Sequence, residues 1–169
     1  MKKKKDELTV NTGLDGFVLI DEITESGTKS INGIKRFSNS PFYLGIESLA
    51  QLGAYHVRFL TRFERHAFLL KITHCRMPAE QVLDGRYLLC GTLMNRSESA
   101  FSYILEAKQE SGTPLLKGKI PPASPLVKVG IKGEFLYGTL DYNDNFKKEI
   151  LQNHYRKVFL CLLNDLKTE

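Results

Sequence analysis

The segment 41–63 limits the possible folds more than any other part of the chain. Ser40 and Pro41 are typical of a helix start, because serine can accept a hydrogen bond from a free helical N–H and proline needs no donor at the first helical position. From 42 to 57 the only formal charge is Glu47, and apolar residues occupy every face of the expected helix. A helix of this kind is buried on most sides. We therefore expect a long helix at the centre of the domain.

Strand-like segments stand on both sides of this helix. Residues 16–24 and 30–38 are rich in β-branched and aromatic residues, and turn-forming residues separate them, so they predict a hairpin. Four more strand-like segments follow the helix, at 68–77, 86–95, 100–108 and 114–120. Strands this close together cannot be joined by parallel crossovers, which predicts an antiparallel sheet. A sheet that covers one long buried helix is expected to curl around it.

The sequence predicts that the chain has three parts. Residues 1–13 are expected to form a basic, flexible N-terminus, and 14–120 a single folded domain of mixed α+β class. Residues 121–169 are expected to form an extension, in which a proline-rich linker at 121–125 precedes a stretch with some strand character and then an amphipathic helix. We expect this helix to pack on its own domain, and a contact with a partner is the alternative.

Charge and composition argue against several classes of function. The net charge is +5, and removing the four charges of Lys2 to Lys5 leaves +1, so the body of the chain does not favour nucleic-acid binding. No apolar run reaches the roughly 18 residues of a membrane span, and none follows the basic N-terminus as in a secretory signal. Cys75, Cys90 and Cys161 form neither a disulfide framework nor a zinc motif. We expect a cytoplasmic protein without a bound metal or cofactor.

Glu47 is the residue that points to chemistry. A carboxylate in an apolar helix is costly to bury unless it is paired, and packing does not require it there. Gln51 lies one helical turn later on the same side, so we expect it to hydrogen-bond the carboxyl group or a ligand. We interpret Glu47 as a general acid or base. The alternative is a structural role, in which the carboxylate reaches the edge of the helix or pairs with Arg36, Arg58 or Arg76.

Other polar groups near the helix point less clearly to a site. Free N–H groups in the first turn, near Leu44, can bind a carbonyl oxygen, but every helix N-terminus has this potential. His56 follows Glu47 by nine residues and is therefore expected on the opposite side of the helix. His74 and Cys75 are adjacent on a strand and face opposite ways, which argues against a joint metal site.

Residues 15–120 resemble the hotdog-fold 3-hydroxyacyl-acyl-carrier-protein dehydratases of fatty-acid synthesis. The resemblance rests on Phe17–Ile23 and Ile34–Ser38 as the first two strands and on Ile46-Glu47-Ser48-Leu49-Ala50-Gln51 in the helix, with weaker matches at Cys75–Pro78 and Asp84-Gly85. It implies the hotdog fold, in which a curled antiparallel sheet wraps a long central helix. It also implies a catalytic role for Glu47 at the mouth of an acyl tunnel and a role for Gln51 beside it.

The chain departs from this family just before the helix. The family carries a His-Phe-Pro-Gly loop there, whose histidine moves the substrate proton, whereas here Phe42-Tyr43-Leu44-Gly45 leads directly into Ile46-Glu47. Dehydration needs a base at the α-carbon and an acid for the departing hydroxyl. In a dehydratase, another polar group such as Asn39 or Tyr43, or a histidine of a partner chain, would have to replace the missing one. We expect the substrate to contact Asn39, Tyr43, Leu44 and Gln51.

The resemblance leads to three hypotheses. The one we favour from sequence is a dehydratase-like lyase that acts on 3-hydroxyacyl thioesters of acyl carrier protein or coenzyme A, in fatty-acid or polyketide-type metabolism. The second is an acyl thioesterase that uses Glu47 alone. The third is a non-catalytic subunit that binds acyl chains, carrier protein or a catalytic homologue. The resemblance also implies a homodimer, or a heterodimer with another hotdog chain.

Overall fold

The computed structural model describes residues 17–79, 81–110, 127–143 and 147–163. The elements are, in chain order, β1 (Glu22–Ser26), β2 (Ser30–Pro41), α1 (Tyr43–Leu60), β3 (Arg65–Arg76), β4 (Val82–Arg96), β5 (Ala100–Glu110), β6 (Val127–Asp141) and α2 (Lys148–Leu162). The strands form one six-stranded sheet in the order β1-β2-β4-β5-β6-β3. Every neighbouring pair is antiparallel, as the sequence predicts.

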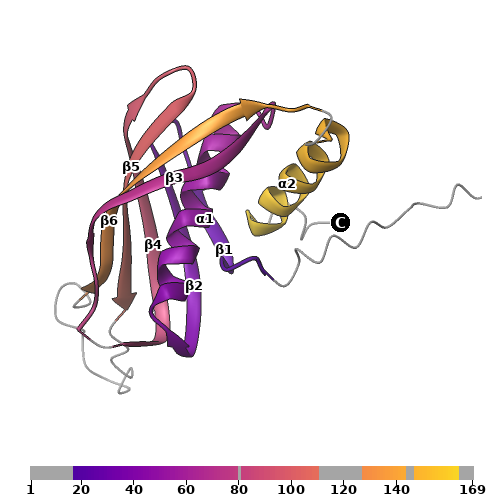
Figure 1. The fold of residues 1–169 in the computed structure, drawn as a ribbon. Coiled ribbons are helices and arrows are strands. Elements are labelled where there is room, and N and C mark those ends of the chain that lie inside the picture. The colour runs from indigo at the N-terminus through magenta and orange to yellow at the C-terminus, as the bar shows by residue number, and fades with distance from the viewer. Residues whose placement is uncertain (1–16, 80, 111–126, 144–146, 164–169) are drawn as a thin grey trace, which may run out of the picture.

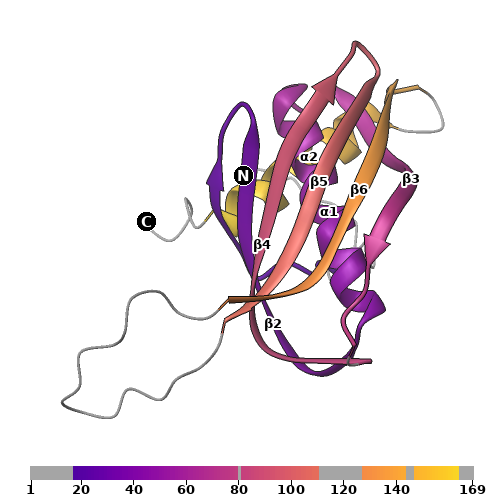
Figure 2. The ribbon, with the colours of Figure 1, turned by 90° about the vertical axis from the view of Figure 1, so that its left-hand side faces the viewer.

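The sheet curls around α1, which lies on its concave side (Figure 1). In the view turned by 90°, the strands β4, β5 and β6 lie side by side in front of the helix (Figure 2). The predicted central helix is therefore present, although it starts at Tyr43 and ends at Leu60. The helix start differs from the expectation: Pro41 is the last residue of β2 and pairs with Val82, so Ser40 does not cap the helix.

The second half of the sheet is organised differently from the sequence prediction. The expected strand at 114–120 and linker at 121–125 lie outside the described residues. The stretch after this linker, for which the sequence indicates only some strand character, forms β6. This strand pairs with β5 on one side and with β3 on the other. The expected end of the domain at 120 therefore does not hold for the sheet, which continues to Asp141. The reason is topological: β3 follows α1 in the chain and reaches the sheet only through β6.

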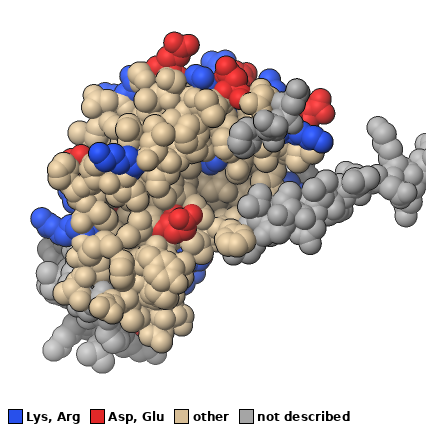
Figure 3. Space-filling model, in the orientation of Figure 1, with Lys and Arg blue, Asp and Glu red and all other residues tan. Residues whose placement is uncertain are grey.

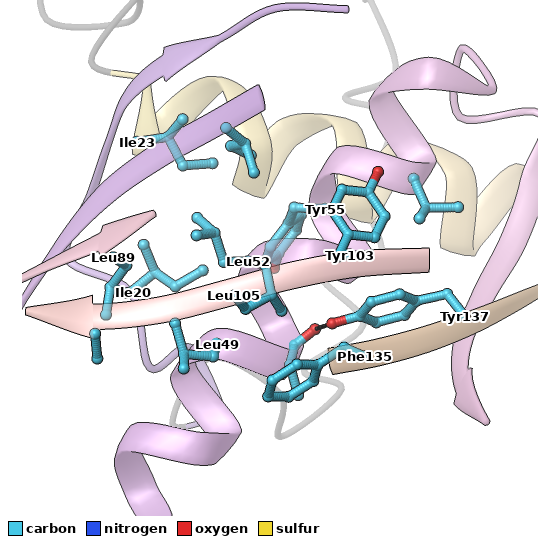
Figure 4. Close-up of a cluster of buried hydrophobic side chains, with 14 of the residues drawn as sticks. Ile20, Ile23, Leu49, Leu52, Tyr55, Leu89, Tyr103, Leu105, Phe135 and Tyr137 are labelled. Carbon is cyan, nitrogen blue, oxygen red and sulfur yellow. Dashed lines mark hydrogen bonds between the residues drawn. The ribbon is translucent and has the colours of Figure 1, made fainter. Parts of the chain in front are cut away.

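The core lies between α1 and the sheet. Leu49, Leu52 and Tyr55 of α1 lie among side chains of β5 and β6, including Leu105 and Phe135 (Figure 4). The helix approaches the sheet closely where its residues are small. A Cβ at Gly45 would lie 2.5 Å from Ile131 Cδ1 and 2.7 Å from Leu83 Cδ1.

The C-terminal helix packs on the same domain, as expected. Phe159 of α2 is 2% exposed, and its ring contacts those of Tyr55, Phe59 and Phe63 around the C-terminal half of α1. Consequently, α1 is covered by α2 near its end and not near its start (Figure 1). Among the described residues, no helix is long and apolar enough to cross a membrane.

Candidate functional site

Helix α1 has one face that neither the sheet nor α2 covers. Glu47 is exposed on this face, and Tyr43, one turn earlier, is 58% exposed. The helical period puts residues 43, 47 and 51 in one row, and the buried residues Gly45, Ser48, Leu49 and Leu52 lie toward the sheet. In the space-filling view, an acidic group stands in a largely uncharged area over α1 (Figure 3).

The side chain of Gln51 contacts Glu47, as the spacing predicts. Its Nε2 donates to Glu47 Oε1 at 3.2 Å and to the carbonyl oxygen of Phe17 at 2.6 Å. Its Oε1 accepts from the N–H of Leu19 at 2.9 Å. The sequence offers no signal that brings residues 17–19 to this position, because no spacing links them to Gln51.

The carboxylate does reach the edge of its helix, the structural alternative considered for it, but it does not pair with the arginines named above. No ion pair joins Glu47 to a cation within the described residues. Arg58 is instead buried under α2, where its guanidinium lies 3.8 Å from the centre of the Tyr155 ring and donates to the carbonyl oxygen of Ala67. Desolvation lowers the pKa of Arg58 from its ordinary value. The exposed carboxylate is thus available to solvent and to a ligand.

The start of α1 has a tight turn beside this face. The N–H of Phe42 donates to the carbonyl oxygen of Gln81 at 3.1 Å, and the N–H of Gly45 donates to that of Phe42 at 2.9 Å. The amides of Tyr43 and Leu44 between them belong to the first turn, where helical geometry provides no i−4 acceptor. These two N–H groups are the ones suited to hold a carbonyl oxygen. Leu44 itself is half-buried against the core.

Asn39 lies in an irregular part of β2. Its φ angle is +45°, and the register of β2 against β4 shifts between Phe37 and Ser40. Its N–H donates to Asp84 Oδ1 at 3.0 Å. Within the described part of the chain, no hydrogen bond joins Asn39 to Glu47 or Gln51, so the structure does not bring this predicted substrate contact into the same cluster.

His56 lies on the buried side of α1 and away from Glu47, as expected from the spacing. It is 0% exposed, and its Nε2 lies 2.8 Å from the carbonyl oxygen of Gly27, which requires the proton on Nε2. Nδ1 then accepts from the Tyr103 hydroxyl at 2.9 Å. Burial lowers the pKa of His56 and raises that of Tyr103 well above its ordinary value. Both groups are therefore neutral structural partners rather than members of the Glu47 cluster.

Surface hollows do not lead to a different site. One of about 680 Å³ lies at the C-terminal end of α1 and is lined largely by charged residues, among them Arg62, Glu64 and Arg65. A smaller one of about 210 Å³ is lined by Pro78, Val82, Leu83, Asp84, Tyr87, Gln109 and Gly130. Leu83 also faces Gly45, so the smaller hollow adjoins the start of α1. In the part of the chain that the structure describes, no group of three His, Cys, Asp or Glu side chains can hold a metal ion.

Sequence comparisons find no match: no protein-family model matches the chain, and neither does any curated protein. Structure comparisons do find similar proteins. One is a chain of the dehydratase heterocomplex ApeI:P from Xenorhabdus doucetiae, with a TM-score of 0.54 and 14% identity over 79% of this chain and 89% of that one. Another is a thioesterase from Haemophilus influenzae, with a TM-score of 0.56 and 12% identity over 78% and 85% of the two chains.

A third similar structure is a mutant thioesterase from Pseudomonas aeruginosa, with a TM-score of 0.55 and 8% identity over 83% of this chain and 97% of that one. At such identities, similarity establishes the fold and does not carry over an activity. Together with the curled antiparallel sheet around α1, these structures show that the chain has the hotdog fold. The fold expected from the helix motif is thus confirmed.

Proposed function

We propose that the protein is an enzyme that hydrolyses acyl thioesters, with Glu47 as its catalytic carboxylate. The observation that carries this proposal is the isolation of Glu47. It is the only acidic residue of α1, it is exposed, and within the described residues only Gln51 hydrogen-bonds its side chain. Hydrolysis can proceed with one carboxylate as general base, whereas dehydration needs an acid and a base.

The chemical step follows from the groups around the helix start. The carboxylate of Glu47 takes a proton from a water molecule, and the oxygen of that water attacks the thioester carbonyl. The N–H groups of Tyr43 and Leu44 stabilise the negative charge that forms on the carbonyl oxygen. The carbon–sulfur bond then breaks, and the proton returns to the departing thiolate. The products are a carboxylic acid and a free thiol.

The uncharged surroundings support an acyl thioester as the substrate class. Tyr43 and Phe17 are 58% and 68% exposed, so they offer apolar surface to an acyl chain. The hotdog fold is shared with two thioesterases and with a chain of a dehydratase complex, which supports the same class. The thiol carrier is coenzyme A or acyl carrier protein.

Dehydration of a 3-hydroxyacyl thioester is the second candidate, and one observation favours it. Tyr43 lies one turn before Glu47 on the same exposed face, which supports its phenol as the proton donor in place of the family histidine. In that reaction Glu47 removes the α-proton, and the Tyr43 O–H donates a proton to the departing hydroxyl, which leaves as water.

We also propose that the chain works as a dimer, either with itself or with another hotdog chain. Strand β3 stands at the edge of the described sheet and is paired only with β6. It exposes 38% of Leu69 and 54% of Leu70. An edge strand with unpaired backbone and apolar side chains is suited to pairing with another chain. A purely non-catalytic subunit would use this edge without turning over substrate.

The reaction can be identified by its product. Saturated acyl-CoA and 3-hydroxyacyl-CoA are offered separately, each also as the carrier-protein thioester, and free thiol and enoyl absorbance are recorded. Thiol release supports hydrolysis, and enoyl formation without thiol release supports dehydration. Turnover that is unchanged in Glu47→Gln would exclude Glu47 as the catalytic residue. Glu149→Gln, which changes an exposed carboxylate on α2, is the matched control.

A further inference from the structure

We propose that Gln51 is a positioning residue, which holds the Glu47 carboxylate and the backbone of residues 17–19 as one hydrogen-bonded unit, so that this segment forms a wall of the site. The proposal deepens the proposed function and rests on the role given there to Glu47. It replaces the sequence-based expectation that Gln51 binds the substrate directly.

Both N–H donors of Gln51 are already used. A side-chain amide offers two N–H donors and an oxygen with two lone pairs. The oxygen accepts from the N–H of Leu19 at 2.9 Å, and the nitrogen donates to Phe17 O at 2.6 Å and to Glu47 Oε1 at 3.2 Å. A substrate carbonyl could bind the amide N–H groups only by displacing one of these partners. Gln51 is therefore not free to donate to a substrate carbonyl, and the role left to it is to hold the groups around it.

The side chain of Gln51 holds the segment before β1 at two backbone positions. These are the carbonyl of Phe17 and the N–H of Leu19, before the segment enters the sheet. The N–H of Asp21 makes the next bond, to the carbonyl oxygen of Ile34 at 2.9 Å in β2. A side chain of the helix thus fixes the backbone of this segment just before the sheet begins.

The side-chain nitrogen of Gln51 links the segment 17–19 to the catalytic carboxylate of the proposed site. Nε2 of Gln51 bonds both the Phe17 carbonyl and the Glu47 carboxylate, so the backbone of Phe17 lies beside the carboxylate. An exposed glutamate samples several side-chain rotamers, and a hydrogen bond to a charged oxygen restricts them. The ring of Phe17 is 68% exposed in this neighbourhood, so it offers apolar surface to an acyl chain whose thioester lies against Glu47.

The hydrogen-bonded unit can be tested by amide hydrogen exchange in the full chain, without an activity assay. Gln51→Met keeps the length of the side chain and removes all three hydrogen bonds. We expect the Leu19 amide to exchange about tenfold faster in this variant, because this backbone N–H loses Gln51 Oε1 as its acceptor. The Asp21 amide, which bonds the backbone of β2, should be unchanged and shows that the sheet is intact. Gln152→Met on α2 is the matched control.

A double-mutant cycle tests whether the unit includes Glu47. Glu47→Ala leaves the Gln51 nitrogen with one partner fewer, so we expect the Leu19 amide to exchange roughly threefold faster than in the wild type. In the Gln51→Met background, the same Glu47→Ala change should have no further effect on Leu19. Equal effects of Glu47→Ala in both backgrounds, or no effect of Gln51→Met on Leu19, would overturn the proposal.

Measurements of kcat and KM, with an acyl-CoA that the wild type hydrolyses, then separate a positioning role from a general loss of structure. Gln51→Met should lower kcat by about tenfold to a hundredfold, because the carboxylate is no longer fixed. Phe17→Ala should raise KM and leave kcat nearly unchanged. If Gln51→Met lowers neither kcat nor kcat/KM while Glu47→Gln abolishes turnover, the positioning role is wrong and the proposed function stands. If no thioester is turned over but the Leu19 exchange behaves as expected, the hydrogen-bonded unit stands and the proposed function is wrong.

Discussion

At the scale of single residues, α1 has opposite environments on its two sides. Glu47 faces solvent, and His56 is fully buried between Gly27 and Tyr103. A buried histidine whose two nitrogens are already bonded, one as donor and one as acceptor, cannot take a proton without losing the bond that its acceptor nitrogen receives. The same helix therefore exposes an acidic side chain on one side and buries a neutral histidine on the other.

This arrangement predicts how stability depends on pH. Burial lowers the pKa of His56 in the folded state, while in the unfolded chain a histidine titrates near about 6.5. Stability is therefore fully present above that pH and falls as the pH drops below it, because only the unfolded chain then takes up the proton. His66, whose pKa is lowered by burial and then by Arg58, adds a loss in the same direction.

Urea unfolding at pH 7.5 and at pH 5.5 measures this effect. We expect His56 to contribute a loss of up to about 1.4 kcal/mol in the free energy of unfolding at the lower pH. His56→Gln should reduce the difference between the two pH values by about that amount, and His154→Gln on α2 serves as the control. An equally large difference in His56→Gln and in the wild type would contradict the assignment of a neutral buried histidine.

Single residues also show what could be read from the sequence. Glu47 could be found because one charge stands out in an apolar helix, and the contact with Gln51 follows from helical spacing. The opposite placement of His56 follows from the same period. The contacts of Gln51 with Phe17 and Leu19 could not be found, because they join segments whose positions only the tertiary fold determines.

At the scale of elements, the close packing of α1 on the sheet depends on glycine. A Cβ at Gly53 would overlap the hydroxyl and the ring of Tyr137, whose hydroxyl donates to the carbonyl oxygen of Ala50 at 2.9 Å. Gly53→Ala should therefore lower the free energy of unfolding by about 1–3 kcal/mol, measured in urea. Gly27→Ala is the control, because a Cβ there would lie 3.8 Å from its nearest neighbour. Equal stabilities of the two variants would contradict this account of the packing.

The docking of α2 depends on one aromatic side chain. The centre of the Phe159 ring lies 5.4 Å from that of Phe63 and 5.5 Å from that of Phe59. Phe159→Ala should destabilise the docked helix by about 3–5 kcal/mol, and amide exchange along α2 should rise accordingly. Ile150→Ala, at a site that is 42% exposed, should have little effect. Slow exchange along α2 in the Phe159 variant would show that other contacts hold the helix.

The elements differ in how well the sequence predicts them. The hairpin of β1 and β2, the helix α1 and the amphipathic α2 follow from periodicity and turn residues that are local in the chain. The place of β6 does not, because its partners β5 and β3 are set by the topology of the sheet. Ser40 and Pro41 look like a helix start because the residue types are typical of one. In the structure, β2 runs through them to pair with β4, and this long-range pairing leaves no local signal in the sequence.

At the scale of the whole molecule, the edge strand β3 predicts self-association. We expect the chain to elute with twice its mass of 19.2 kDa when size-exclusion chromatography is combined with light scattering. Leu70→Lys should give monomers, because a charge at the edge opposes pairing. Leu140→Lys, at a site that is 49% exposed on β6, is the matched control. A wild-type monomer at micromolar concentration would contradict the homodimer and would leave the heterodimer with another hotdog chain to be tested.

If Glu47 is the catalytic base of a thioesterase, its loss must stop thiol release. The rate of thiol release from saturated acyl-CoA substrates is therefore measured for the wild type and for Glu47→Gln at equal concentration. We predict turnover by the wild type and a loss of about a hundredfold or more in the variant, because a neutral amide cannot act as the base. Equal rates for the two proteins would show that Glu47 is not the catalytic base.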